Sequence, residues 1–226
     1  MLNIVEKVDD AVSIRNVLIS VSDKSGLEDF VRGLCDACPG VTFYSTGGTF
    51  AAIEKILGKG SPKLKSVSDY TGQPEMQGGL VKTLDFKIYT GLLSETYNEA
   101  HRSDLKRIGA VEFDMTVVNL YPFRETVSRS DVTVEEARTN IDIGGPCMLR
   151  ASSKNFLRVA VLCDPADYRE VLDELKRNNG ALSLATRFRL GQKGFRHTAD
   201  YDRAIADFLE SRDESALSVY QIQNRG

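Results

Sequence analysis

The 226-residue chain contains 42% apolar and 27% charged residues and has a formal net charge of −3. These values are ordinary for a soluble globular protein of one large domain, and they argue against a broad nucleic-acid-binding surface because no block of Lys and Arg stands out. No apolar run approaches the length of a membrane span and the N-terminus does not resemble a secretory signal, so a cytoplasmic protein is expected.

The cysteines do not form a metal-binding pattern. Cys35 and Cys38 have C-x-x-C spacing, but a zinc site would need a second close pair, and Cys147 and Cys163 are far apart in the sequence. We therefore expect free thiols and no metal site.

The first half of the chain predicts repeated strand–turn–helix units. Residues 16–21 form a short run rich in branched apolar residues, which predicts a buried strand. A Ser25–Glu28 capping box then predicts the start of a helix. A second strand over 41–45 and a second helix over 50–57 repeat the pattern. Such units build a parallel sheet with ligands at the carboxyl ends of its strands.

Both strand-to-helix turns carry small hydroxyl residues or glycines, and the first also carries a lysine. Backbone N–H groups at a helix N-terminus, with hydroxyls and a cation nearby, can bind phosphate. The predicted phosphate-binding residues are Ser22, Lys24, Ser45, Thr46, Gly47, Gly48 and Thr49. The alternative, two well-capped helices without a ligand, remains open at this point.

The middle of the chain is less regular. Short strands are predicted at 65–67 and 87–89, separated by a long loop over 68–79 that leads into Lys82. A loop of this length in a compact domain is usually functional. Beyond it the sequence predicts a helix over 95–108, a core strand over 113–120 that ends at Asn119 and Tyr121, and a short helix behind a Thr133–Glu136 capping box.

Residues 140–155 combine an acid, a flexible turn, a helix N-terminus and a lysine. Asp142 precedes Gly144 and Gly145, which allow a sharp bend, and Pro146 suits the first turn of a helix. That helix would reach about Ser153 and place Lys154 at its far end. The Asp–Lys pair could move protons, although an ordinary tight loop before a helix would give the same pattern.

The C-terminal part predicts a strand over 158–163, a helix over 164–176 and a long helical segment over 183–209, in which two glycines could cause a bend. The tail beyond residue 211 is polar and is expected to be loosely ordered. The predicted organisation is an N-terminal extension (1–14), one α/β domain (15–182), and a C-terminal helical extension with a tail (183–226).

Several motifs occur in the order and spacing of a known family. They are Val-Ser-Asp-Lys-Ser-Gly-Leu (21–27), Ser-Thr-Gly-Gly-Thr (45–49), Val-Lys-Thr-Leu (81–84), Asn-Leu-Tyr-Pro-Phe (119–123), Ile-Asp-Ile-Gly-Gly-Pro (141–146), Ser-Lys-Asn (153–155), Asp-Pro-Ala-Asp-Tyr (164–168) and His-Thr-Ala-Asp-Tyr-Asp (197–202). The chain resembles the IMP cyclohydrolase domain of the bifunctional purine-biosynthesis enzyme that also carries AICAR formyltransferase. The match covers residues 15–209.

The resemblance implies a methylglyoxal-synthase-like fold, a mostly parallel sheet with helices on both faces. It implies dehydrative ring closure of FAICAR to IMP, without a cofactor or metal, by a homodimer. Asp142 would orient the carboxamide and relay its proton, Lys82 and Lys154 would act on the formyl oxygen, and Tyr121 would bind near it. The remaining substrate contacts implied are Thr83, Asn119, Ile143, Gly144 and Gly145.

The chain departs from the family on one side of the expected pocket. Leu80, Asp85 and Phe86 stand where the family usually has Arg, His and Pro, and Gln73 stands where Phe is usual. The sequence does not include the formyltransferase half, so the chain is either a natural single-domain cyclohydrolase or a fragment of a longer protein. In the single-domain case a separate AICAR formyltransferase would have to supply FAICAR.

Three interpretations therefore remain open. The first is an active IMP cyclohydrolase. The second is a diverged enzyme acting on a related phosphoribosyl carboxamide. The third is a non-catalytic phosphate-ligand-binding domain, like the regulatory domain of carbamoyl phosphate synthetase, which would not need Tyr121, Asp142 or Lys154.

Overall fold

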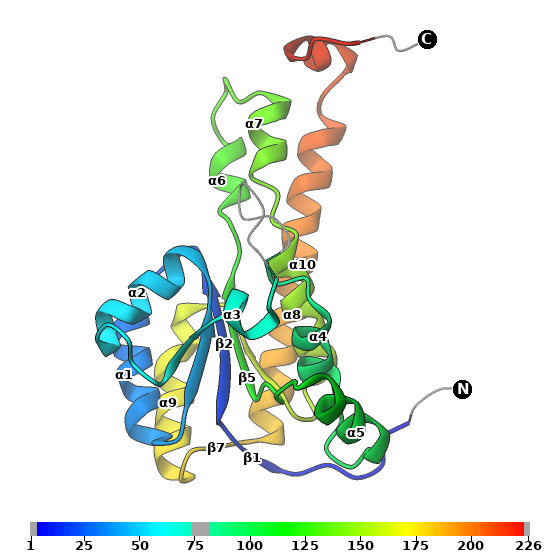
Figure 1. Cartoon of the computed structure of the whole chain (residues 1–226). Helices are drawn as coiled ribbons and strands as arrows, with labels where there is room; N and C mark the ends of the chain where they lie inside the picture. The colour runs from blue at the N-terminus through cyan, green and yellow to red at the C-terminus, as the bar shows by residue number, and fades with distance from the viewer. Residues whose placement is uncertain (1–3, 74–81, 224–226) are drawn as a thin grey trace.

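The fold is built on a five-stranded parallel sheet. A computed structural model describes residues 4–73 and 82–223 of the chain. Its strand order is β4-β3-β2-β5-β6, with every neighbouring pair parallel (Figure 1). These strands are β2 (Asn16–Val21), β3 (Thr42–Ser45), β4 (Leu64–Ser66), β5 (Met115–Asn119) and β6 (Ala160–Leu162). The predicted parallel α/β sheet is confirmed.

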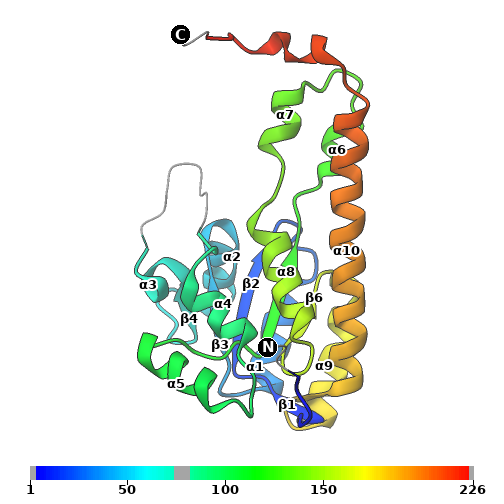
Figure 2. The same ribbon diagram turned by 90° about the vertical axis from the view of Figure 1, so that its right-hand side faces the viewer.

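Helices cover both faces of the sheet. On one face α1 (Leu27–Ala37) packs against α9 (Tyr168–Arg177), and on the other α4 (Phe86–Leu93) packs against α8 (Gly144–Lys154) (Figures 1 and 2). The long α10 (Leu184–Glu210) lies along α8 and β6. The other helices are α2 (Gly47–Leu57), α3 (Val67–Thr71), α5 (Glu99–Ile108), α6 (Phe123–Val127), α7 (Val134–Thr139) and the 3-10 helices η2 (Pro165–Asp167) and η3 (Glu214–Val219). Within the described ranges, no helix combines the length and apolar character needed to cross a bilayer.

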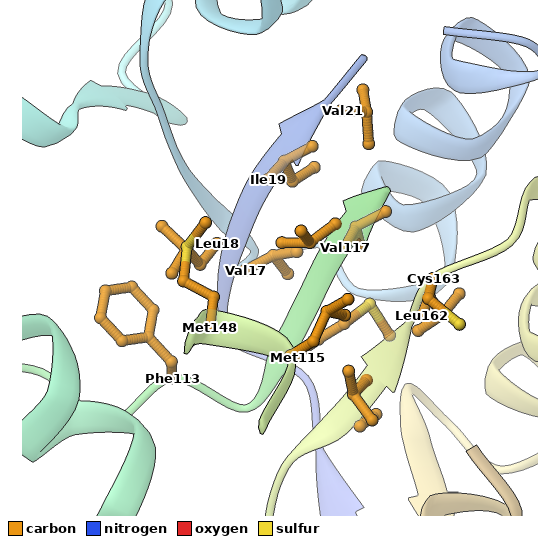
Figure 3. Close-up of a cluster of buried hydrophobic side chains, with 14 of the residues drawn as sticks. Val17, Leu18, Ile19, Val21, Phe113, Met115, Val117, Met148, Leu162 and Cys163 are labelled. Atoms are coloured by element: carbon orange, nitrogen blue, oxygen red, sulfur yellow. The ribbon is translucent and has the colours of Figure 1, made fainter. Parts of the chain in front are cut away.

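The core lies between the sheet and these helices. Figure 3 shows Val17 of β2 and Met115 and Val117 of β5 on adjacent strands, with Met148 of α8 beside Leu18. All five side chains are buried. Strands covered on both faces need nearly continuous apolar sequence, which is why the runs at 16–21 and 113–120 were readable as strands.

The N-terminal segment is joined to the C-terminal part. β1 (Ala11–Ser13) pairs antiparallel with β7 (Ala181–Ser183). The fully buried guanidinium of Arg187 donates hydrogen bonds to the carbonyls of Asp9, Asp10, Phe156, Leu157 and Leu182. A division of the chain after residue 14 and after residue 182 would therefore cut through these contacts.

Two local predictions were wrong, and a third was confirmed. The expected strand at 87–89 lies inside α4, which Asp85 caps by accepting a hydrogen bond from the Lys87 N–H at 2.8 Å. Helix α1 begins after Gly26, whose φ is 68°, and the Ser25 hydroxyl bonds Asp23 instead of capping the helix. The predicted Thr133–Glu136 capping box is present at α7.

The C-terminal extension is also more ordered than expected. Helix α10 is continuous over 27 residues, so its glycines do not interrupt it. Together with α6 and α7, its C-terminal half projects beyond the carboxyl ends of the strands (Figures 1 and 2). The polar tail forms η3, and the Tyr220 hydroxyl donates to Glu135 at 2.6 Å.

Candidate active site

A cavity of ≈ 470 Å³ lies where the strands β2, β3 and β5 end. Tyr121 also lines a second cavity of ≈ 540 Å³. We choose the cavity of ≈ 470 Å³ as the candidate site because of the chemistry of the residues that line it. Parallel α/β sheets bind ligands at this edge. Of the predicted residues, those lining the cavity are Ser22, Lys24, Thr46, Gly47, Gly48, Thr49, Lys82, Thr83, Asn119, Tyr121, Asp142, Ile143, Gly144 and Gly145.

One end of the cavity is suited to an anion. Helix α2 begins at Gly47, whose φ of 56° favours glycine, and the first N–H groups of any helix lack intrahelical partners. The Lys82 ammonium lies 3.5 Å from where a Cβ on Gly47 would stand. Lys24 also lines the cavity, and its ammonium donates to the Val21 and Ser22 carbonyls in the first turn. A helix N-terminus with two cations is a favourable place for a phosphate.

Two predicted hydroxyl ligands have structural roles instead. The buried Thr49 hydroxyl donates to the Val21 carbonyl at 3.0 Å and accepts from the Val21 N–H at 3.1 Å. The buried Ser45 hydroxyl donates to the Ile19 carbonyl at 2.8 Å, and Ser45 does not line the cavity. Both hydroxyls therefore join β2 to the neighbouring β3–α2 unit, and direct contact with phosphate was a wrong prediction for Ser45.

Asn119 shapes the first turn. Its side-chain oxygen accepts from the N–H groups of Ser22 at 2.6 Å and Asp23 at 2.9 Å, and its amide donates to the Asp23 carbonyl at 2.8 Å. These bonds occupy the Asn119 side chain, which was expected to contact the substrate. They also occupy backbone N–H groups that were expected to bind phosphate, so the first turn presents the Ser22 side chain and Lys24 to the cavity.

The other notable group is the carboxylate of Asp142. It accepts a hydrogen bond from the Gly145 N–H at 2.9 Å and interacts with the backbone N–H groups of Gly144 and Tyr121. Burial raises the pKa of Asp142, and these N–H bonds only partly offset that effect. The acid is thus a stronger base than an exposed aspartate.

Close approach explains both glycines of this turn. A Cβ on Gly145 would stand 2.5 Å from Asp142 Oδ2, and one on Gly144 would stand 2.7 Å from Thr83 Oγ1. Larger residues would displace the carboxylate or the buried threonine. The predicted bend is therefore also a packing requirement of the site.

Lys154 is not at this cavity. It is exposed at the C-terminal end of α8, whereas Asp142 lies just before the N-terminal end. A helix rises 1.5 Å per residue, so about 15 Å separates the two ends. Within a single copy of the chain, Lys154 therefore lies away from the cavity that Asp142 lines, and its action on the formyl oxygen stays a prediction.

Two of the family departures, Asp85 and Phe86, fall outside the described lining. Asp85 caps α4, and Phe86 is 68% exposed; neither residue lines the cavity. Leu80 lies outside the described residues. Tyr121, 51% exposed, does line the cavity.

Sequence reasoning missed one residue beside the site. The Tyr201 hydroxyl of α10 accepts a hydrogen bond from the Asp142 N–H at 2.8 Å. Tyr201 belongs to the motif at 197–202, but nothing in its local sequence indicates a contact with a residue far earlier in the chain.

The cysteines are free thiols, as predicted. Burial raises the pKa of Cys38 to about 11, and its thiol lies against the Gly180 carbonyl. Within residues 4–73 and 82–223, no group of three or more His, Cys, Asp and Glu side chains is arranged to hold a metal ion.

Two family models and several known proteins match the chain. The family model "MGS-like domain" matches residues 26–147, and "AICARFT/IMPCHase bienzyme" matches residues 152–225. The chain is 48% identical over 205 residues to the "Bifunctional purine biosynthesis protein PurH" of Chlorobium phaeobacteroides (strain BS1), spanning 91% of this chain and 38% of that protein. It is 47% identical over 196 residues to the protein of the same name from Ruminiclostridium cellulolyticum, spanning 87% of this chain and 37% of that protein.

Among solved structures, the chain is similar to one titled "Crystal structure of ForH". The TM-score is 0.73 at 29% identity, covering 87% of this chain and 100% of that one. The chain spans well under half the length of the PurH relatives given above. These matches confirm the resemblance read from the motifs, and the chain belongs to the MGS-like domain family.

Proposed function

We propose that this chain is an IMP cyclohydrolase, which closes the second ring of FAICAR to give IMP and water. The observation that carries the proposal is that a partly buried carboxylate, Asp142, and a lysine beside a turn suited to an anion, Lys82, line one cavity. The PurH relatives are bifunctional by name, and the chain corresponds to about a third of them. The assignment of this particular activity therefore rests on the site.

The reaction needs a base and a group that stabilises oxygen. The carboxamide nitrogen attacks the formyl carbon, a C–N bond forms, and the nitrogen loses a proton. The former formyl oxygen gains two protons and departs as water, while the formamido nitrogen loses its proton and the ring C=N bond forms. Asp142 is assigned to accept the amide proton, since its raised pKa suits a general base. Lys82 and Tyr121 are assigned to the oxygen, where developing negative charge needs donors.

The 5′-phosphate is assigned to the α2 N-terminus. Gly47 and Gly48 offer backbone N–H groups, and Ser22 and Lys24 add a hydroxyl and a charge. The Lys82 ammonium rests near Gly47 and would lie between the phosphate and the reacting group. Thr83 and Ile143 are assigned to the walls around the base. Lys154 receives no direct contact with the substrate in this scheme.

Partners follow from the chemistry of the substrate. A formyl-transfer reaction onto the AICAR amine must produce FAICAR, so we propose that an AICAR formyltransferase works with this chain, and that the chain is a homodimer. The alternative of a diverged enzyme draws on the departures at Leu80, Asp85 and Phe86. Asp85 and Phe86 lie outside the cavity lining, which favours FAICAR itself as the substrate.

The test is direct turnover of FAICAR, followed by IMP absorbance. We expect the wild-type chain to form IMP, and we expect Lys82→Ala and Asp142→Ala each to lower kcat by about 10²-fold or more. Lys87→Ala is the matched control, because Lys87 follows closely in the sequence but bonds the Tyr70 carbonyl outside the cavity.

The possible results of this test distinguish the proposed function from its alternatives. Folded wild-type protein that forms no IMP would defeat the proposal. Thermal stabilisation by IMP without turnover would support a non-catalytic binding domain instead. Near-normal turnover in Lys82→Ala or Asp142→Ala would remove the role assigned to that residue.

A further inference from the structure

The side chain of Tyr201 is hydrogen-bonded to the backbone of Asp142. Its side chain is only 8% exposed and comes from α10, an element outside the strand-to-helix turns. The hydroxyl accepts from the Asp142 N–H at 2.8 Å and donates to the Asn140 carbonyl at 3.3 Å. Both hydrogen-bonding functions of the hydroxyl therefore serve the segment that leads into Asp142.

The ring of Tyr201 contacts the second segment of the site. It packs edge-on against Phe123 with ring centroids 6.1 Å apart. The Phe123 N–H donates to the Tyr121 carbonyl at 2.7 Å, and the Tyr121 N–H in turn interacts with the Asp142 carboxylate. One side chain thus joins the segment of Tyr121 to the segment of Asp142.

The two halves of Asp142 are fixed by different partners. Its carboxylate is held by the N–H groups of Tyr121, Gly144 and Gly145. Its own N–H is held by Tyr201. Tyr201 does not line the ≈ 470 Å³ cavity, so a ligand there would meet Asp142 without meeting the Tyr201 ring.

We propose that Tyr201 is a positioning residue, which fixes Asp142 for proton transfer through the Asp142 N–H and the Asn140 carbonyl. This role deepens the proposed cyclohydrolase activity and rests on it. A general base must stand within hydrogen-bond reach of its proton, and small displacements of such groups reduce rates strongly. The C-terminal helix is therefore part of the catalytic apparatus, although it contributes no contact with substrate.

The test compares Tyr201→Phe with Tyr70→Phe. Both changes keep the ring and remove a hydroxyl that accepts a backbone N–H, since Tyr70 accepts from Val111 at 2.9 Å away from the cavity lining. We expect Tyr201→Phe to lower kcat for FAICAR about 10- to 100-fold with little change in KM, and to move the acid limb of the kcat–pH profile. Tyr70→Phe should leave both unchanged.

Amide hydrogen exchange gives a readout that does not need turnover. Exchange at the Asp142 N–H should accelerate in Tyr201→Phe and stay at the wild-type rate in Tyr70→Phe. Unchanged kcat, or equal losses of kcat and stability in both variants, would overturn the proposal. If the wild-type protein forms no IMP, the cyclohydrolase assignment fails. In that case, unchanged exchange at the Asp142 N–H in Tyr201→Phe would also overturn the positioning role. Accelerated exchange at that N–H would support it.

Discussion

At the residue scale, burial and the backbone N–H groups of Gly145, Tyr121 and Gly144 set the pKa of Asp142. Burial raises the pKa of this carboxyl because ionisation in a poorly solvated place is unfavourable. A base with this character binds a proton more readily than an exposed aspartate.

This raised pKa predicts the shape of the pH profile. The reaction needs the ionised carboxylate, so kcat should fall as pH decreases through the folded-state pKa of Asp142. That acid limb should lie above the ordinary aspartate pKa of about 3.9. Measuring kcat for FAICAR against pH checks this, with Asp167→Asn as a comparison outside the cavity lining. An acid limb at or below the ordinary value would contradict the assignment of Asp142 as the base.

Residue types in this site were readable from the sequence, but several roles were not. Ser45, Thr49 and Asn119 lie near the strand ends as predicted, yet their polar groups bond neighbouring backbone. A hydroxyl that can satisfy a buried backbone group looks the same in sequence as one that binds phosphate. Ser25 and Thr133 make the same point, since both have a Glu three residues later and only Thr133 caps its helix.

At the element scale, α8 and α10 approach each other through small residues. A Cβ on Gly194 would stand 2.3 Å from the Ser153 hydroxyl oxygen, and one on Gly191 would stand 3.2 Å from Phe156 Cβ. The glycines that were expected to bend α10 instead allow this close contact. Helix α8 begins just after Asp142, and α10 carries Tyr201. The contact between these helices therefore sets the spacing between Asp142 and Tyr201.

We therefore expect Gly194→Ala to destabilise the fold by about 1–3 kcal/mol through overpacking, although alanine favours helix. Gly40→Ala is the control, because a Cβ there meets nothing within 4 Å. Urea denaturation of both variants measures the free energy of unfolding. Equal stability of Gly194→Ala and the wild type would show that the helices can move apart freely.

Elements with long or strongly apolar patterns were predicted well, whereas the short strand predicted at 87–89 was wrong. The strand at 16–21 matches β2, and the helical segment at 183–209 matches α10 within a residue at each end. The three-residue pattern at 87–89 carried too little periodicity to separate strand from helix. The pairing of β1 with β7 had no local signal, because it joins segments far apart in the chain.

At the scale of the whole molecule, Arg187 joins the two ends of the fold. Its buried guanidinium bonds carbonyls from the N-terminal segment, from the residues between α8 and β6, and from β7. Burial lowers the pKa of Arg187, but these carbonyl dipoles compensate for the missing water. A buried charge of this kind is costly to disturb.

Arg187→Met should thus reduce the free energy of unfolding by about 3–5 kcal/mol, because several buried carbonyls would lose their partner. Arg189→Met serves as control: Arg189 is 42% exposed and pairs with Glu170, so its loss should cost less than about 1 kcal/mol. Urea denaturation compares the two variants. A similar decrease in the free energy of unfolding in both variants would contradict a special role for the buried guanidinium of Arg187.

The two family matches meet between residues 147 and 152, inside helix α8. That helix begins at the acid turn, packs against α10 and is followed by β6 of the central sheet. A boundary between sequence families therefore runs through the middle of one rigid element. A recombination crossover between related genes at this point would join the first half of α8 from one protein to the second half from another. The two halves would then pack against elements that did not evolve with them, so we expect the two matched regions to be inherited together.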